Sequence, residues 1–280
     1  MNNADSAGTA KEKVILTGVS ETALLTLNSR AREARRPDRI LDDPRAVALV
    51  DSIDFDFAKF GTTRQDMALR SLAFDGQTRG YLQQHPKATV VALAEGLQTS
   101  FWRLDAAIPN AQFRWLTVDL EPMIDVRSKL LPSSPRVSLC AQSALDYSWM
   151  DKVDTADGVF ITAEGLLMYL QPEESMGLIA ECARRFPGGA MMFDVPPSLF
   201  GWLLRRGVRT SMRYTAPPMP FTLSAAEAAN LVNTVPGVRA VRDIPLPLGR
   251  GLIFNTLLSA SHWFRPLDEL RPSFTLLEFG

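Results

Sequence analysis

Two features of the sequence could together hold a nucleotide-like ligand: a glycine turn and an acid that follows it. Residues 89–93 form a short, apolar run rich in β-branched side chains, which is typical of a buried strand. The chain then turns at Gly96, and a helical pattern begins at Gln98. The next apolar run ends in Asp119, about 20 residues further on, where such folds place an acid for ribose hydroxyls. Although the full G-x-G-x-x-G pattern is absent, the pair indicates an adenosine-containing cofactor.

Other chemistry-bearing residues are few. Apolar residues recur at helical spacing from Asp66 to Gln84, and Arg70 and Arg79 lie on this helix, where their simplest role is packing or surface pairing. Either guanidinium could also turn toward an anionic ligand. The chain's 2 histidines and 2 cysteines have no metal-ligand spacing, so we expect no metal site and two reduced, buried thiols.

The elements around these residues alternate between strand and helix, which favours a parallel sheet covered by helices on both faces. The expected strands are 90–93, 113–118, 137–140, 159–162 and 190–195, with a final pair at 238–244 and 252–258 that could form an antiparallel hairpin. The expected helices are 20–36, 42–50, 66–84, 98–106, 122–131, 172–186 and 224–232, the last capped by Ser224.

An insert interrupts this alternation between Pro196 and Phe221. It carries prolines at both ends, with aromatic, aliphatic and basic side chains between them. A long insert after the carboxyl end of a strand is well placed to cover a ligand crevice, so we interpret it as a substrate lid, with structural padding as the alternative.

Composition excludes several classes of protein. The chain has 280 residues, 46% of them hydrophobic and 22% charged, with a formal net charge of −1. These values are typical of a globular protein without a field for nucleic acid or acidic membranes. A basic cluster at Arg30, Arg32, Arg35 and Arg36 is interrupted by acids, and we expect a solvated or internally paired helix face there. No secretory leader pattern or membrane-spanning run is visible, so we expect a cytoplasmic protein.

Several blocks of the sequence resemble the leucine carboxyl methyltransferase family of S-adenosylmethionine-dependent O-methyltransferases, in particular its bacterial, polyketide-modifying branch. The two most specific blocks are R-A-R-E-A-R-R-P-D at 30–38 and A-E-G-L-L-M-Y-L at 163–170. Further matches, in the same order, are L-T-G-V-S-E-T-A at 16–23, L-D-D-P at 41–44, E-G-L-Q-T at 95–99, R-L-D at 103–105, V-D-L at 118–120 and F-P-G-G at 186–189.

The resemblance implies a Rossmann-like class I methyltransferase fold with a mostly parallel, seven-stranded sheet. Residues 1–13 are small and polar, so we expect a disordered start, and the resemblance implies a single domain at 14–280. Within that domain we expect a helical cap at 14–87, a cofactor-binding core at 88–195, a lid insert at 196–222 and the end of the core at 223–280.

The resemblance also implies roles for individual positions. S-adenosylmethionine, with S-adenosylhomocysteine as product, would contact Arg70 through its methionine carboxylate, Asp119 through its ribose and Glu164 through its amino group. Glu164 and Tyr169 would position the reacting groups. The remaining expected cofactor contacts are Ala94, Gly96, Leu120, Ala144 and Leu145, and the expected substrate contacts are Trp202, Arg205, Arg209, Tyr214 and Met219.

The chain departs from the family at this glycine turn. Ala94 stands where a glycine is usual, and it would crowd the cofactor if its φ were positive. Gln98 and Ser100 replace a charged pair. A cofactor-binding but inactive regulatory module is therefore an alternative to an enzyme, and a nicotinamide-dependent oxidoreductase is a more remote one.

The expected function is O-methylation of a small or polyketide-like metabolite in secondary metabolism, by direct in-line transfer. Carboxylates are ionised near neutral pH and need no general base, whereas phenols do, so we favour a carboxylate acceptor over a hydroxyl. Arg205 or Arg209 would then anchor the acid. We expect a monomer or homodimer with no nucleic-acid or membrane partner.

Overall fold

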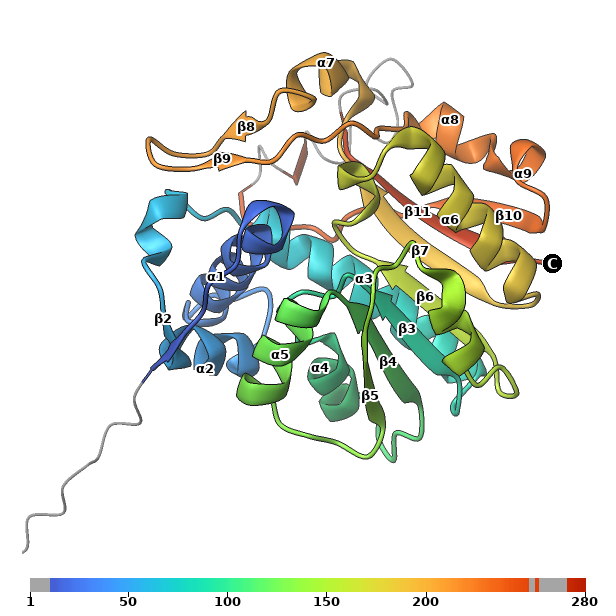
Figure 1. Ribbon diagram of the computed structural model, residues 1–280, viewed down its shortest axis with the longest axis horizontal. Helices are drawn as coiled ribbons and strands as arrows, with labels where there is room; N and C mark the ends of the chain where they lie inside the picture. Colours follow the sequence, from blue (N-terminus) through green and yellow to red (C-terminus); the bar gives the residue numbers. More distant parts are fainter. Residues whose placement is uncertain (1–10, 252–254, 257–270) are drawn as a thin grey trace, which may run out of the picture.

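The computed structural model describes residues 11–251, 255–256 and 271–280 (Figure 1). Its centre is a seven-stranded sheet with the order β10-β11-β7-β6-β3-β4-β5. The strands are β3 (Thr89–Leu93), β4 (Arg114–Asp119), β5 (Val137–Ala141), β6 (Val159–Ala163), β7 (Ala190–Val195), β10 (Val238–Asp243) and β11 (Ser273–Phe279). Strands β3 to β7 pair in parallel, and β11 runs antiparallel to both of its neighbours. The expected mostly parallel sheet is confirmed.

The sheet is buried on both faces because side chains of successive strand residues point to opposite sides. In β3, Val90 and Ala92 pack on the face covered by α3 (Asp66–Gln84) and α4 (Ser100–Ala107). Val91 and Leu93 pack on the opposite face, covered by α6 (Pro172–Arg185) and α9 (Leu231–Thr234). The sheet therefore separates two hydrophobic clusters and holds its strand ends rigidly.

A third hydrophobic cluster is formed mainly by side chains of the N-terminal cap. It joins α1 (Thr22–Ala34), α2 (Pro44–Ser52) and α5 (Glu121–Leu130). The Asp43 side chain accepts a hydrogen bond from the Ala46 backbone N–H and so caps α2. The shorter elements of this half are β1 (Glu12–Lys13), η1 (Gly18–Glu21), β2 (Ile53–Asp54) and η2 (Phe57–Phe60).

The insert after β7 contains η5 (Ser198–Phe200), α7 (Gly201–Leu204) and a small hairpin of β8 (Val208–Arg209) and β9 (Thr215–Ala216). In Figure 1 these elements form the upper rim of the molecule, above the cap. The remaining elements are η3 (Tyr147–Lys152), η4 (Leu167–Tyr169) and α8 (Ala225–Ala229).

Three expectations about the elements were wrong. Residues 12–13, expected to be disordered, form β1 and pair with β2; residues 1–10 are outside the described part. The helix expected at 98 begins at Ser100, because residues 94–98 form a turn whose carbonyls are bound by side chains. The helix expected at 224–232 is two helices, α8 and α9, although Ser224 caps the first as expected.

The antiparallel partner of β10 was also misplaced. The expected strand at 252–258 falls almost entirely outside the described residues, and its two described positions, 255 and 256, are helical. The partner of β10 is β11, which the sequence analysis missed. Between β10 and β7, β11 is buried on both faces, so it lacks the alternation that marks an edge strand.

Candidate active site

A cavity of about 610 Å³ opens at the carboxyl ends of the parallel strands. Its walls come from the segments that follow β3, β4, β5, β6 and β7, together with the cap and the inner side of the insert. In open α/β sheets, ligands bind outside the carboxyl ends of the strands, and a cavity of this size is in the usual range for a small ligand. All eight expected cofactor residues line it: Arg70, Ala94, Gly96, Asp119, Leu120, Ala144, Leu145 and Glu164.

The turn after β3 has an unusual backbone. Gly96 has φ +57° and Ala94 has φ +47°, so both are in the left-handed region. A Cβ atom on Gly96 would lie 3.0 Å from the Ala23 side chain of the cap, which leaves room for no larger residue. Ala94 adopts the same left-handed conformation with a Cβ, which costs about 1–2 kcal/mol of strain. Its φ is the positive value at which the sequence analysis expects the Cβ to crowd the cofactor, and the residue lines the cavity.

Asp119, at the end of β4, is bound to this turn. Its Oδ2 accepts a hydrogen bond from the Gly96 N–H at 2.7 Å, and its Oδ1 accepts one from the Leu120 N–H at 2.8 Å. Burial raises the pKa of this carboxyl, and the two N–H donors offset only part of the rise. The carboxylate faces the cavity and can accept further hydrogen bonds there, as ribose hydroxyls require.

Two buried arginines hold the three carbonyls of the turn. The Arg127 guanidinium donates to the carbonyl oxygens of Gly96 at 2.7 Å and Gln98 at 3.0 Å. The Arg30 guanidinium donates to the carbonyl of Leu97 at 2.7 Å. Both side chains are 1% exposed. Because α5 and α1 carry these arginines, the cap and the core together fix the turn that lines the cavity.

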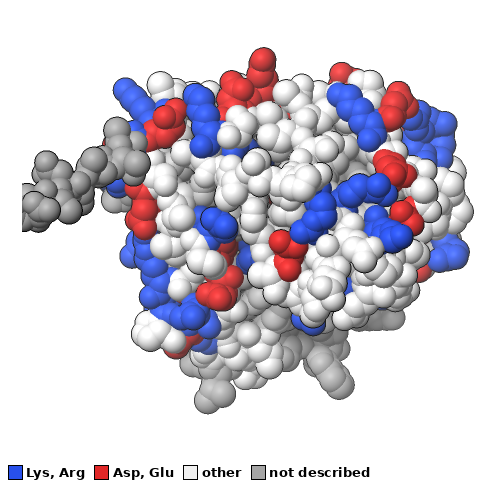
Figure 2. All heavy atoms as spheres, turned by 90° about the horizontal axis from the view of Figure 1, so that it is seen from below, with Lys and Arg blue, Asp and Glu red and all other residues white. Residues whose placement is uncertain are grey.

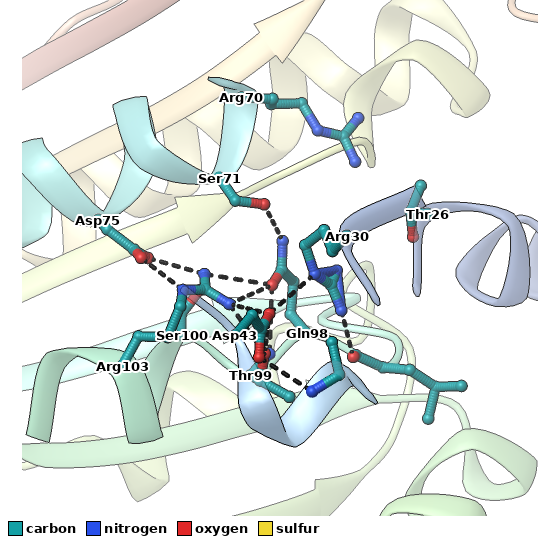
Figure 3. Close-up of polar contacts among 12 residues, drawn as sticks. Thr26, Arg30, Asp43, Arg70, Ser71, Asp75, Gln98, Thr99, Ser100 and Arg103 are labelled. Atoms are coloured by element: carbon teal, nitrogen blue, oxygen red, sulfur yellow. Dashed lines mark hydrogen bonds and ion pairs between the residues drawn. The ribbon is translucent and has the colours of Figure 1, made fainter. Parts of the chain in front are cut away.

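Behind the turn, a buried polar network joins the cap to α3 and α4 (Figure 3). Asp43, which has no exposed side-chain surface, contacts Arg30 at 3.4 Å and Arg103 at 2.8 Å, and it accepts from the Thr99 hydroxyl. Burial would raise the pKa of Asp43, but the two guanidinium groups outweigh it and lower that pKa. Burial lowers the pKa of Arg30 to about 10. Arg103 also forms an ion pair with Asp75, with 2.6 Å between Nε and Oδ2.

A second charged cluster faces the cavity directly. Arg70 Nε lies 2.9 Å from Glu164, and its Nη1 lies 3.5 Å from Asp194. The Gln98 amide nitrogen donates to Glu164 at 2.7 Å, and also to Ser71 at 2.7 Å. Burial would lower the pKa of Arg70, but the two carboxylates outweigh it and raise that pKa. Burial also raises the pKa of Asp194, against the effect of Arg70.

This cluster explains the departure from the family pattern at the turn. Gln98, in place of an acid, donates to the carboxylate of Glu164, which a second acid would repel. Ser100, in place of a base, accepts from the Arg103 guanidinium at 2.9 Å. Arg103 thus supplies, from one turn further along α4, a positive charge beside the network. The replaced pair therefore does not leave an unpaired charge.

The rest of the cavity is apolar or weakly polar. Near the expected adenine positions, Gln142 and Ser143 line the wall beside Ala144 and Leu145. On the other side, Tyr169 and Met219 line the cavity as expected, and burial raises the pKa of the Tyr169 phenol. Their apolar neighbours are Leu25, Met67, Leu166, Met168, Pro196, Pro197, Leu204, Val208, Leu246 and Phe274.

Four expected substrate residues do not line the cavity. Trp202 is 58% exposed on the outside of the insert, and Arg205 and Arg209 are also exposed. Arg209 instead donates to the backbone carbonyls of Ser211 and Met212. Tyr214 is buried edge-on against the ring of Phe60, with 4.8 Å between ring centroids. The insert turns its small and aliphatic residues inward and its basic residues outward, so neither arginine can anchor an acid as expected.

The sequence analysis also missed functional neighbours. Arg30 belongs to a basic cluster that was expected to be solvated or internally paired, and it is internally paired, with Asp43, but its role at the turn was not foreseen. Arg127 and Asp194 were not singled out. A usable signal was present for Arg30, since it stands in a specific block with an acid three positions later. For the other two, only the fold reveals that they meet the turn and Arg70.

Two negative findings concern the described residues alone. None of their helices has the length and apolar character needed to cross a bilayer. Within the same residues, no group of His, Cys, Asp and Glu side chains has the geometry of a metal site.

Comparisons with known proteins agree with this geometry. The sequence profile of the family described as "Leucine carboxyl methyltransferase" matches residues 23–183. The chain is 32% identical to the tetracenomycin polyketide synthesis O-methyltransferase TcmP of Streptomyces glaucescens, covering 81% of this chain and 83% of TcmP. It is 26% identical to the S-adenosyl-L-methionine-dependent methyltransferase dpfgK of Gibberella zeae, covering 91% and 93% of the two chains.

Solved structures with the same fold are more distant in sequence. A DUF574 family protein from Streptomyces avermitilis superposes with a TM-score of 0.58 at 13% identity, covering 92% of this chain and 97% of that one. The CurJ carbon methyltransferase superposes with a TM-score of 0.51 at 10% identity, covering 93% and 68%. At such identities the likeness establishes the fold and nothing finer.

Proposed function

The chain belongs to the leucine carboxyl methyltransferase family of S-adenosylmethionine-dependent methyltransferases, and from that membership we propose that it methylates an oxygen atom of a small, largely apolar metabolite. The observation that carries the proposal is the arrangement of charge around one apolar cavity. Asp119 lies at one wall, and the cluster of Arg70, Glu164 and Asp194 lies at another.

The residues present fit S-adenosylmethionine. The cofactor carries a positive sulfonium, a positive amino group and a negative carboxylate, so its net charge is positive. The cluster offers two carboxylates for the amino group and one guanidinium for the carboxylate, which is complementary in both sign and number. Asp119 would accept from the ribose hydroxyls, and the apolar wall at Ala144 and Leu145 would receive the adenine.

When bound, S-adenosylmethionine supplies an electrophilic methyl group on its sulfonium. The protein's task is then to align the acceptor oxygen with that methyl and to exclude water. Alignment of this kind can lower a barrier by about 7–11 kcal/mol. The turn held by Arg127 and Arg30 fixes one reactant, and the insert and the cap close the cavity around the other.

We favour a carboxylate as the acceptor group. No histidine lines the cavity among the described residues, and the carboxylates of Glu164 and Asp194 are assigned above to the amino group of the cofactor rather than to the acceptor. A phenol, with a pKa of about 10, would need a base, whereas a carboxylic acid is already ionised near neutral pH. The apolar wall and the likeness to a polyketide O-methyltransferase support a polycyclic or polyketide-like skeleton.

Calorimetric titration with S-adenosylmethionine and with S-adenosylhomocysteine tests the cofactor site. Arg70→Ala and Asp119→Ala should each weaken binding by tenfold or more, because each removes a charge-assisted contact. Arg79→Ala, on the same helix but exposed, and Asp125→Ala, at an exposed position of α5, are the matched controls. Equal affinity in all five proteins would refute the assignment of the pocket.

An acceptor screen tests the choice of group. Pairs of aromatic compounds that differ only in bearing a carboxylic acid or a phenol are incubated with the protein and cofactor. Mass spectrometry then distinguishes methyl esters from methyl ethers. Esters are expected; ethers without esters would reverse the preference, and cofactor binding without turnover on any compound would favour an inactive binding module.

A further inference from the structure

The outer face of the insert combines exposed apolar side chains with unbalanced positive charge. Residues 195–226 contain four arginines and no Asp, Glu or Lys. The whole chain has a formal net charge of −1, so this segment departs strongly from the average. On the face shown in Figure 2, by contrast, acidic and basic side chains are interspersed. The small net charge of the chain therefore conceals a local basic surface.

Three of these arginines retain their charge at the surface. Arg205, Arg206 and Arg209 are exposed, and none of them forms an ion pair with a carboxylate of the described residues. Arg213 differs, because it pairs with Asp56 at 2.7 Å. The Arg206 guanidinium lies over the Trp202 ring, 5.7 Å from its centroid, which brings a cation and an exposed aromatic side chain together.

The apolar side chains of the same segment are exposed to an unusual degree. Leu199 is 48% exposed, Phe200 41%, Trp202 58%, Leu203 45% and Met212 84%. A single exposed apolar residue needs no explanation, but four within residues 199–203 are typical of an interaction surface, and Met212 extends the exposed apolar set to the loop between β8 and β9. We call these five residues, with Arg205, Arg206 and Arg209, the outer face of the insert.

We propose that the outer face of the insert binds the surface of an anionic lipid bilayer. Such a surface explains both the apolar and the basic side chains. The leucine, phenylalanine and tryptophan side chains would insert among the acyl chains, and the arginines would pair with lipid phosphates. An acidic soluble protein would match the charge but gives less reason for so many exposed aliphatic side chains. This binding is peripheral and needs no membrane-spanning helix. The proposal departs from the expectation of no membrane partner, which was drawn from the net charge of the whole chain and not from the charge of this segment.

The inner side of the insert suggests what binding to a bilayer would achieve. Leu204, Val208, Ala216 and Met219 come from the same segment and line the cavity. A bilayer against the outer face would therefore lie one layer of protein away from an apolar pocket. A lipophilic compound dissolved in the bilayer could reach the cavity without crossing water, and this does not depend on which group is methylated.

Flotation of the full-length protein with vesicles tests the proposal without cofactor or acceptor, so its outcome is independent of the proposed function. Vesicles of phosphatidylcholine alone are compared with vesicles that also contain phosphatidylglycerol. We expect binding to the anionic vesicles and little to the neutral ones. One arginine near an anionic surface contributes about fivefold to partitioning, so R205Q/R206Q should weaken binding about 25-fold.

The matched control is R32Q/R45Q, which removes the same charge from exposed positions in the cap. It should leave most of the binding intact. W202S should weaken binding to anionic vesicles without altering the circular dichroism spectrum, since Trp202 is exposed and not part of a core cluster. Lipids with a quencher in the acyl chain should reduce the tryptophan fluorescence of the wild type and much less that of W202S.

Two results would overturn the proposal. One is the absence of binding to anionic vesicles by the intact protein at low ionic strength. The other is equal loss of binding in R205Q/R206Q and R32Q/R45Q, which would mean that only overall charge matters. Sedimentation at increasing protein concentration examines whether the same face pairs with a second copy; dimerisation that W202S abolishes, without vesicle binding, would replace the bilayer as its occupant.

Discussion

Replacing Arg127 should reveal how much of the fold depends on the turn that lines the cavity. In Arg127→Met the carbonyls of Gly96 and Gln98 lose their donor, and Glu95, 2.9 Å from the guanidinium, becomes an unpaired buried charge. The two side chains of this pair are 1% and 3% exposed. Removing one partner of so buried a pair costs about 3–5 kcal/mol, a large part of the stability of a typical domain.

The double variant E95Q/R127M separates the effect of the charge from that of the contacts. Glu95 also accepts hydrogen bonds from the Trp115 indole and the Thr117 hydroxyl, and a glutamine oxygen can accept both. With no charge left unpaired, the double variant should recover about half of the lost stability or more. Its affinity for S-adenosylhomocysteine should remain reduced, because the turn carbonyls still lack their donor.

Urea denaturation followed by circular dichroism measures these differences. Lys129→Met on the same helix is the control: Lys129 forms an exposed pair with Glu12, with side chains 61% and 43% exposed, and such pairs contribute less than about 1 kcal/mol. The reasoning fails if Arg127→Met loses no more stability than the control, or if adding E95Q to it restores nothing.

Three further predictions concern the turn, the acid and the thiols. Ala94→Gly should stabilise the protein by about 0.5–1 kcal/mol, since relief of strain at φ +47° exceeds the added freedom of the unfolded chain, whereas Ala94→Val should destabilise it; thermal unfolding of both checks the sign. Burial raises the pKa of Asp119, and only its ionised form accepts both ribose hydroxyls, so affinity for S-adenosylhomocysteine should fall on acidification. The fall should begin at a pH above the ordinary aspartate pKa of about 4. Calorimetry should show that the affinity of Asp119→Asn depends less on pH. Cys140 and Cys182 are buried and burial raises the pKa of the Cys182 thiol, so a colorimetric thiol reagent should react with neither in the native protein and with both in urea.

The sequence predicted most elements that have a strong local signal. Helix α3 has the predicted bounds, 66–84, because its apolar spacing is regular and a histidine and a proline follow it. Strands β3 to β7 were predicted within a residue or two because each is a short, largely apolar run between helical patterns. Strand β11 was missed because its neighbours in the sheet, β10 and β7, are far away in sequence, and its own pattern does not reveal two-sided burial.

The candidate site likewise contains residues that a local sequence signal reveals and residues that only the fold reveals. Gly96 follows a buried strand and Asp119 ends the next one, so the pattern predicts that both lie at the same edge of the sheet. The direction in which a side chain of the insert points does not follow, and this is why Arg205 and Arg209 were wrongly assigned to the substrate. Arg30 and Arg127 were missed as supports of the turn, since arginines are rarely fully buried and their partners are backbone carbonyls, which carry no sequence signal.

Because Arg30 donates a hydrogen bond to the Leu97 carbonyl, the N-terminal cap is part of the structure of the cofactor-side turn and not an independent unit. During synthesis α1 emerges long before residue 97. Until then the Arg30 guanidinium lacks the Leu97 carbonyl as its acceptor and is not yet buried beside Asp43. A chain truncated after the cap would have to solvate this charge, and one that began beyond it would keep every strand of the large sheet yet present a looser turn. Exchanging caps between relatives, an obvious route to new acceptors, should therefore succeed only where the arginine, its acid and the turn are exchanged as one unit.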